Sequence, residues 1–248
     1  MSDTTPENLK TQDYSEKPRK QVRYEGQISA VRYLDPQDRI DATRLREIFT
    51  SPAVRPWMEE LDLTDQELLA LMGEQGPTKN RRYHLFAVSA SQKSKPESIG
   101  EIQGFVRFYF GPEEREETQV LVEDGLVTKD DLKEKRLLEI SFAKSPDTPP
   151  GRMVGGIMQA CLETSKRMQR EKDKDPNNIM VLAYIVPENT NSIRAVEAAG
   201  FIDIGTVSHY GKENKPNKVY KLSWALLHQK MQSDASNDAS KFFNSDPA

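Results

Sequence analysis

The sequence predicts one α/β domain built on a mixed, mostly antiparallel sheet. Residues 83–90 and 99–110 resemble two strands joined by a polar turn, which indicates an antiparallel hairpin. Residues 137–143, 153–168 and 180–186 have the patterns of a strand, a helix and a strand covered on both faces. This order predicts a right-handed parallel crossover. The chain of 248 residues can bury one sizeable core once its polar ends are set aside.

The remaining elements flank the hairpin and the crossover. Before the hairpin we expect a strand over residues 27–34 and two helices, the second over residues 63–72. After the crossover, a helix over residues 192–199 should end at Gly200, because glycine tolerates positive φ there. The apolar positions of the first helix are Leu45, Ile48 and Phe49, and the closing strands are expected over residues 201–208 and 218–224.

The polar ends and one internal segment lie outside this pattern. Residues 1–21 and 230–248 carry almost no apolar anchors, so we expect both to be disordered around a domain of residues 22–229. Residues 112–134 form an acidic insertion with nine carboxylates against three basic side chains, a local net charge of −6. The plainest interpretation is a solvated excursion with a short helix; alternatively, the insertion steers cationic amines toward a binding site.

Composition excludes several classes of function. A formal net charge of −4 gives no basic surface for nucleic acid. One cysteine, Cys161, allows no internal disulfide or cysteine-rich metal site, and His84, His209 and His228 are too scattered for structural zinc. No stretch approaches the roughly 18 apolar residues of a membrane span, and the first residues lack the apolar core of a signal peptide. We expect a cytoplasmic protein with no metal, either a monomer or a homodimer.

The most informative stretch covers residues 186–201. It lies where a parallel strand ends and a helix begins, a position at which open α/β sheets bind ligands. Its pattern, Asn189-x-x-Ser192 followed by a short helix and Gly-Phe, resembles the GNAT acetyltransferases, particularly the ribosomal-protein N-acetyltransferase branch. The resemblance implies that Asn189 and Ser192 contact coenzyme A. An ordinary helix cap at Asn189 would explain the same residues.

A glycine-containing turn precedes the crossover helix. In the GNAT family this place holds R/Q-x-x-G-x-G/A, whose amides bind the coenzyme pyrophosphate at the positive end of the helix dipole. If Arg152 opens the motif, Gly155 fits and Ile157 takes the place of the final small residue; a frame shifted by one fits Gly156 but leaves Met158 there. The residues implied to bind the pyrophosphate are Gly151, Arg152, Met153, Val154, Gly155 and Gly156.

The resemblance covers residues 27–224 and implies the GNAT fold, with a splayed parallel strand pair and helices on both faces of the sheet. The main chain of Phe142, Ala143 and Lys144 would pair with the pantetheine arm as an added strand would. The implied reaction is direct transfer of acetyl from acetyl-CoA to an amine, which must first lose a proton. The carboxylates closest to the expected site are Glu139 and Glu101, each of which could instead be a solvated strand residue.

One departure from the family concerns the general acid. Many GNAT enzymes carry a tyrosine in the helix after the asparagine, where this chain has Val196. Tyr184, Tyr210 or Tyr220 could substitute, or solvent could protonate the thiolate. The departure leaves two alternatives open: a non-catalytic module that binds coenzyme A or a protein, and an enzyme that transfers a longer acyl group. Cys161 lies on the apolar stripe of its helix, which predicts a buried structural role.

Overall fold

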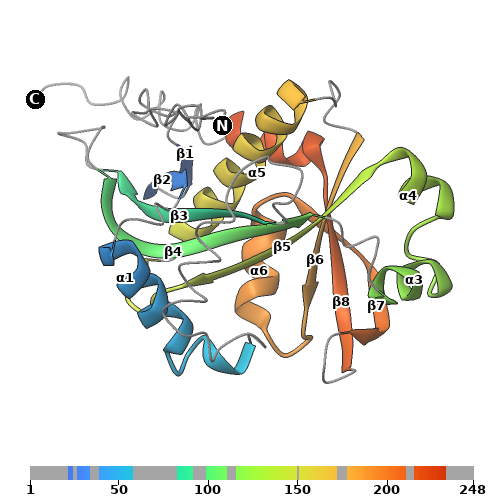
Figure 1. Ribbon diagram of the computed structural model, residues 1–248, viewed down its shortest axis with the longest axis horizontal. Helices are drawn as coiled ribbons and strands as arrows, with labels where there is room; N and C mark the ends of the chain where they lie inside the picture. Colours follow the sequence, from blue (N-terminus) through green and yellow to red (C-terminus); the bar gives the residue numbers. More distant parts are fainter. Residues whose placement is uncertain are drawn as a thin grey trace, which may run out of the picture.

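A computed structural model describes residues 22–24, 27–33, 39–57, 83–91, 99–110, 116–149, 151–171, 178–210 and 215–232. Its strands form one eight-stranded sheet in the order β1-β2-β3-β4-β5-β6-β8-β7 (Figure 1). Neighbouring strands are antiparallel except β5 and β6. The strands are β1 (Val22–Tyr24), β2 (Gln27–Tyr33), β3 (Tyr83–Ser91), β4 (Ile99–Phe110), β5 (Arg136–Lys144), β6 (Ile179–Ile185), β7 (Phe201–Tyr210) and β8 (Lys215–Leu222).

Helices cover both faces of this sheet, as the sequence predicts. They are α1 (Arg39–Thr50), the 3-10 helix η1 (Arg55–Trp57), α3 (Glu116–Glu123), α4 (Lys129–Glu134), α5 (Arg152–Glu171), α6 (Thr190–Ala198) and a last helix over residues 224–232. Helices α5 and α6 pack on one face in the largest apolar cluster, with Phe86, Val106 and Leu138 from the strands. In Figure 1, α1 and the α3–α4 pair lie at opposite ends of the view with β5 and β6 between them.

Two smaller apolar clusters share the other face. One packs α1 against β3 and β4 and includes Ala143 of β5; the other packs the α3–α4 segment and includes Leu137 of β5. Side chains alternate along a strand, so residues 137, 139, 141 and 143 point to the same face. Glu139 and Ser141 therefore lie between the two clusters.

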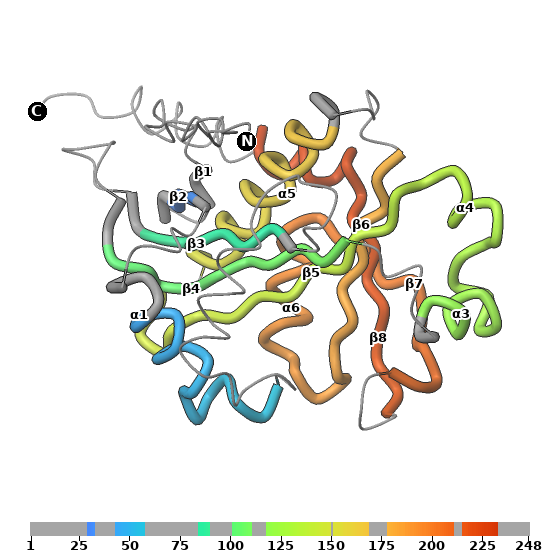
Figure 2. Tube along the Cα trace, viewed as in Figure 1, coloured from blue at the N-terminus to red at the C-terminus, as the bar shows by residue number. Residues whose placement is uncertain are grey.

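Strands β5 and β6 run together for only part of their length. Their register extends from Arg136↔Ile179 to Glu139↔Leu182 and then stops. Beyond this point residues 140–144 pair with β4, whereas residues 183–185 pair with β8. Figure 2 shows the two strands diverging, β5 toward α1 and β6 toward the start of α6. The expected splayed pair is thus present, with its fork at Glu139 and Leu182.

The acidic insertion differs from the expected solvated excursion. Leu121 is fully buried and Val127 nearly so, in a cluster with strand residues of β5 to β8. Asp124 also accepts a hydrogen bond from the Ser208 amide of β7 at 2.8 Å. At Gly205 a Cβ would lie 2.5 Å from Leu126 Cδ2, so glycine makes room for this segment. The expected short helix is present as α3, followed by α4, but the described part is not a solvated excursion, because its apolar side chains pack against the sheet.

The ends of the helices and strands agree only in part with those predicted from the sequence. Gly200 follows the α6 C-cap with φ of +100°, which confirms the predicted helix end. Strand β1 was not expected, and Trp224 begins the last helix rather than ending β8. That helix extends to residue 232, past the domain boundary expected at position 229. The helix expected over residues 63–72 and the termini 1–21 and 233–248 lie outside the described residues.

Candidate functional site

The fork between β5 and β6 brings together most of the residues singled out in the sequence. Phe142, Ala143 and Lys144 lie on the β5 arm beyond the fork, where β4 pairs with one edge of the strand and β6 no longer pairs with the other. This arm extends five residues past Glu139, about 17 Å in extended conformation. An extended ligand could add to the unpaired edge in the way a strand does.

The β5 arm leads into a turn that is fixed by hydrogen bonds to β4. The Gln103 carbonyl accepts from the Ser145 amide at 2.8 Å and from the Thr148 hydroxyl at 2.6 Å. Lys144 Nζ donates to the Thr148 carbonyl at 3.1 Å. The hydroxyl of Ser145 donates to Asp147 Oδ1 at 2.7 Å, and this bond lowers the pKa of the Asp147 carboxyl. The turn therefore has a defined geometry where it enters α5.

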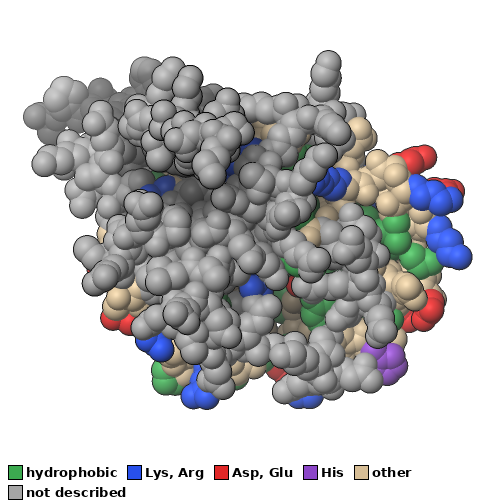
Figure 3. Space-filling view, viewed as in Figure 1, with side chains coloured by type: hydrophobic (Ala, Val, Ile, Leu, Met, Phe, Trp, Pro, Cys, Tyr) green, Lys and Arg blue, Asp and Glu red, His purple; other side chains and the backbone are tan. Residues whose placement is uncertain are grey.

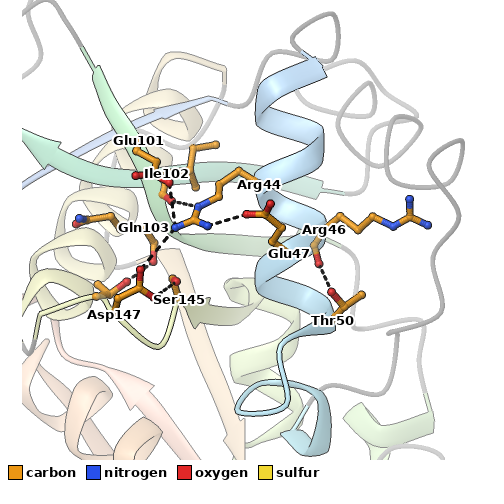
Figure 4. A network of polar contacts seen from close by, with 10 residues as sticks. Arg44, Arg46, Glu47, Thr50, Glu101, Ile102, Gln103, Ser145 and Asp147 are labelled. Atoms are coloured by element: carbon orange, nitrogen blue, oxygen red, sulfur yellow. Dashed lines mark hydrogen bonds and ion pairs between the residues drawn. The ribbon is translucent and has the colours of Figure 1, made fainter.

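Arg44 of α1 links this turn to the first residues of β4 (Figure 4). Its guanidinium donates to the Ile102 carbonyl at 3.2 Å and to Glu47 at 2.7 Å, and it lies 3.1 Å from Glu101 and 3.9 Å from Asp147. The side chain of Glu101 is 71% exposed, so this ion pair is weak. Position 101 is also eight residues along β4 from Tyr109, the partner of Glu139, a separation of about 27 Å. The two candidate carboxylates do not share one site.

The N-terminus of α5 begins directly behind the turn. Gly151 has φ of +80°, a conformation that favours glycine, and the helix starts at Arg152. A helix leaves its first amides without partners inside the helix. Gly155 is already inside, since its amide donates to the Gly151 carbonyl at 3.1 Å. The Arg152 amide donates to the Pro149 carbonyl at 3.3 Å, so the amides that the helix can present to an anion are those of Met153 and Val154.

Gly156 has a packing role in this structure. A Cβ at this position would lie 2.6 Å and 2.8 Å from the two methyl groups of Val88, which is fully buried on β3. Glycine is required because α5 crosses the sheet closely here. A bulky side chain at Gly156 would therefore disturb the packing of α5 on β3, whatever its effect on coenzyme binding.

The start of α6 lies at the end of the β6 arm. Asn189 is its N-cap, and its side-chain oxygen accepts from the Ser192 amide at 3.2 Å. This geometry confirms the capping alternative for Asn189. The cap uses the oxygen of the side-chain amide, so the Nδ2 donor remains compatible with the coenzyme contact implied by the resemblance, which stays a prediction.

A polar strip crosses the otherwise apolar face of the sheet, between the apolar cluster that packs α1 and the apolar cluster that packs the α3–α4 segment. It consists of Arg107, Tyr109, Glu139 and Ser141, which are cross-strand neighbours on β4 and β5. Arg107 is 9% exposed and its Nε donates to Ser141 Oγ at 2.9 Å. Arg107 and Tyr109 were not singled out from the sequence. The available signal was a charged residue inside the aromatic strand run of residues 105–110.

Two tyrosines complete the fork on this face. Tyr210 of β7 donates its phenolic hydrogen to Glu139 Oε1 at 2.6 Å. Its ring stacks on Tyr184 of β6, with centroids 4.1 Å apart and planes at 13°. Tyr220, in contrast, is fully buried in the α5–α6 cluster, where desolvation raises the pKa of its phenol. Of the three tyrosines considered from sequence, Tyr184 and Tyr210 lie at the fork.

Three other side chains considered from the sequence, those of Val196, Cys161 and His84, are buried and pack in the core. Val196 and Cys161 are buried in the α5–α6 cluster, which confirms the structural role predicted for Cys161, and burial raises the pKa of its thiol. His84 lies edge-on to Phe110 at 4.3 Å, and desolvation lowers its pKa to about 3. No group of three His, Cys, Asp or Glu side chains within the described ranges could hold a metal ion. Nor is any helix in those ranges long and apolar enough to span a membrane.

The fold matches several solved structures, although no protein-family model and no curated protein matches the chain. RimJ from Mycobacterium smegmatis with CoA-disulfide is 12% identical, with a TM-score of 0.58 over 87% of this chain and 93% of that one. A GNAT-family acetyltransferase from Bacillus anthracis is 18% identical, with a TM-score of 0.50 over 82% and 98%. The chain has the GNAT acetyltransferase fold.

A further GNAT-fold neighbour has both its coenzyme and an amine bound. It is spermidine N-acetyltransferase from Vibrio cholerae in complex with CoA and spermine, 15% identical, with a TM-score of 0.50 over 78% of this chain and 92% of that chain. Identities this low extend the likeness to the fold alone. The resemblance inferred from residues 151–156 and 186–201 is confirmed at that level.

Proposed function

We propose that this protein is an N-acyltransferase that transfers acetyl from acetyl-CoA directly to an amine. One observation carries the proposal: the β5–β6 fork has a carboxylate, Glu139, at its apex and the N-terminus of α5 behind its β5 arm. The pantetheine arm would pair with residues 142–144, and the pyrophosphate would lie over the amides of Met153 and Val154. The thioester would then reach the fork.

Glu139 is the proposed general base. An aliphatic ammonium has a pKa near 10.4 and an α-ammonium near 8, so attack at neutral pH requires removal of a proton. Glu139 lies where the two arms separate, on the face that carries the polar strip. Glu101, ion-paired with Arg44 far along β4, is not part of this proposal.

The acceptor is proposed to be an amine, with cationic amines preferred. Support comes from the spermine bound to the GNAT-fold neighbour and from the acidic residues of the α3–α4 segment. Figure 3 shows basic side chains beside the acidic ones at this edge of the molecule. Asp131 pairs with Lys135, and Asp130 pairs with Lys133 at 3.4 Å. Such pairs reduce the local negative charge, so we expect a modest preference that salt weakens.

The test is a calorimetric titration of the full chain with acetyl-CoA, followed by thiol release with spermidine, an aminoglycoside, a peptide with a free N-terminus and a neutral amine. We expect coenzyme binding and release of thiol with at least one amine. Glu139→Gln should bind acetyl-CoA as the parent does and turn over at least 100-fold more slowly. A chain that does not bind acetyl-CoA would refute the proposal.

The second candidate function is coenzyme binding without catalysis. It is favoured by Val196, a buried aliphatic side chain where many GNAT enzymes carry a tyrosine. In this case acetyl-CoA binds, no amine in the panel releases thiol, and Glu139→Gln changes nothing. The same two measurements therefore separate the two functions.

A further inference from the structure

Tyr210 contacts both strands of the fork, at the Glu139 apex on β5 and at Tyr184 on the β6 arm, although its own strand pairs with neither. In the sheet order β5-β6-β8-β7, its strand is separated from β6 by β8. Its hydroxyl nevertheless donates to Glu139 at the last paired position of β5, and its ring stacks on Tyr184, two residues beyond the last paired position of β6. One side chain thus bridges the strands where they separate.

An irregularity in β7 brings Tyr210 to this face. Val207 is fully buried in the α3–α4 cluster, and strict alternation would turn a residue three positions later to the opposite face of the sheet. The β7–β8 register shifts between Val207 and Tyr210, and Tyr210 packs against the same cluster as Val207. A β-bulge inserts one residue and re-aims the side chain that follows it.

We propose that Tyr210 is a positioning residue, which holds the Glu139 carboxylate at the apex of the fork by a hydrogen bond while its ring stacks on Tyr184 of the β6 arm. The proposal rests on the function proposed above, in which Glu139 is the general base. A glutamate side chain has several rotatable bonds, and a base contributes only when it lies within hydrogen-bond reach of the proton it removes. The 2.6 Å bond from Tyr210, whose ring stacks on Tyr184, holds one carboxylate oxygen of Glu139 at the fork.

The test uses Tyr210→Phe, which removes the hydroxyl and keeps the aromatic ring for stacking. With the amine that gives the fastest turnover in the panel above, we expect kcat to fall about tenfold while KM for acetyl-CoA changes less than twofold. Tyr220→Phe makes the same chemical change on β8 in the cluster on the other face, and we expect it to leave kcat unchanged. An unchanged kcat in Tyr210→Phe would overturn the proposal.

A double-mutant cycle distinguishes positioning from a general structural effect. If Tyr210 acts through Glu139, then Tyr210→Phe causes no further loss of kcat when it is added to Glu139→Gln. Effects that multiply would show an independent role and overturn the proposal. Failure of the proposed function is seen separately, as a parent chain that does not bind acetyl-CoA or a Glu139→Gln variant that turns over normally. Either of these results also removes the role of Tyr210, whereas an inert Tyr210→Phe beside a damaging Glu139→Gln removes that role alone.

Discussion

Gly156 offers the sharpest test of how α5 is held on the sheet. Gly156→Ala would place a methyl group 2.6 Å and 2.8 Å from the Val88 methyl groups, both in a fully buried side chain. Overpacking of this kind costs about 1–3 kcal/mol, and alanine recovers about 1 kcal/mol over glycine through helix propensity. We therefore expect a net loss of about 1 kcal/mol in the free energy of unfolding. Urea unfolding followed by circular dichroism measures it.

The origin of this loss can be checked with a second substitution at Val88. Val88→Ala removes these two methyl groups and leaves only the Cβ, 3.3 Å from the added carbon, so Gly156→Ala should no longer destabilise the protein in the Val88→Ala background and should recover up to about 1 kcal/mol. Affinity for acetyl-CoA should change little, because the proposed anion contacts are the amides of Met153 and Val154. A Gly156→Ala protein as stable as the parent, or one whose loss persists in the Val88→Ala background, would refute the close contact.

Two further predictions concern His84 and Asn189. The pKa of His84 is about 3 in the folded chain and near 6.5 unfolded, so the unfolded state binds more protons between these values and stability rises with pH. Between pH 7.5 and pH 5.5, the free energy of unfolding of the parent protein should fall by about 1.4 kcal/mol more than that of His84→Leu. If the free energies of unfolding of the two proteins change in parallel with pH, the prediction is wrong. Asn189→Asp keeps the α6 cap and should not lower stability, but the proposed amide contact predicts that acetyl-CoA binding weakens by more than about 1 kcal/mol. Full affinity in a folded Asn189→Asp protein would leave the residue as a cap only.

The parts of the fold that depend on local sequence could be predicted. The hairpin of β3 and β4 follows from alternating apolar runs around a polar turn, and the end of α6 follows from a glycine that adopts positive φ. The crossover from β5 through α5 to β6 follows from the order of the elements. In each case the signal lies within a few residues, or in the order of neighbouring elements.

The acidic insertion shows where composition misleads. Its many charged residues suggest a solvated segment. Leu121 and Val127 are nevertheless buried, and Leu126 packs against Gly205 of β7, so the segment is joined to the sheet. The helix α3 has only eight residues, so its apolar periodicity is a weak signal in the sequence beside so many carboxylates. The decisive contact comes from β7, about 80 positions later in the chain, and no local pattern reveals it.

The candidate site depends on register, which the sequence does not contain. In the sequence, Glu101 and Glu139 are equivalent, since each is an acidic residue in an apolar strand. The pairing of Glu139 with Leu182 places one carboxylate at the fork. The pairing of Glu139 with Tyr109 leaves the other, Glu101, at the far end of β4, where it pairs with Arg44. A shift of one residue in β5 would turn Glu139 toward the α5–α6 cluster, where an unpaired carboxylate is costly to bury. The alternation of side chains along β5 buries Leu138 and Ile140 on one face and places Glu139 in the polar strip on the other. The position of the proposed base therefore follows from how the core packs.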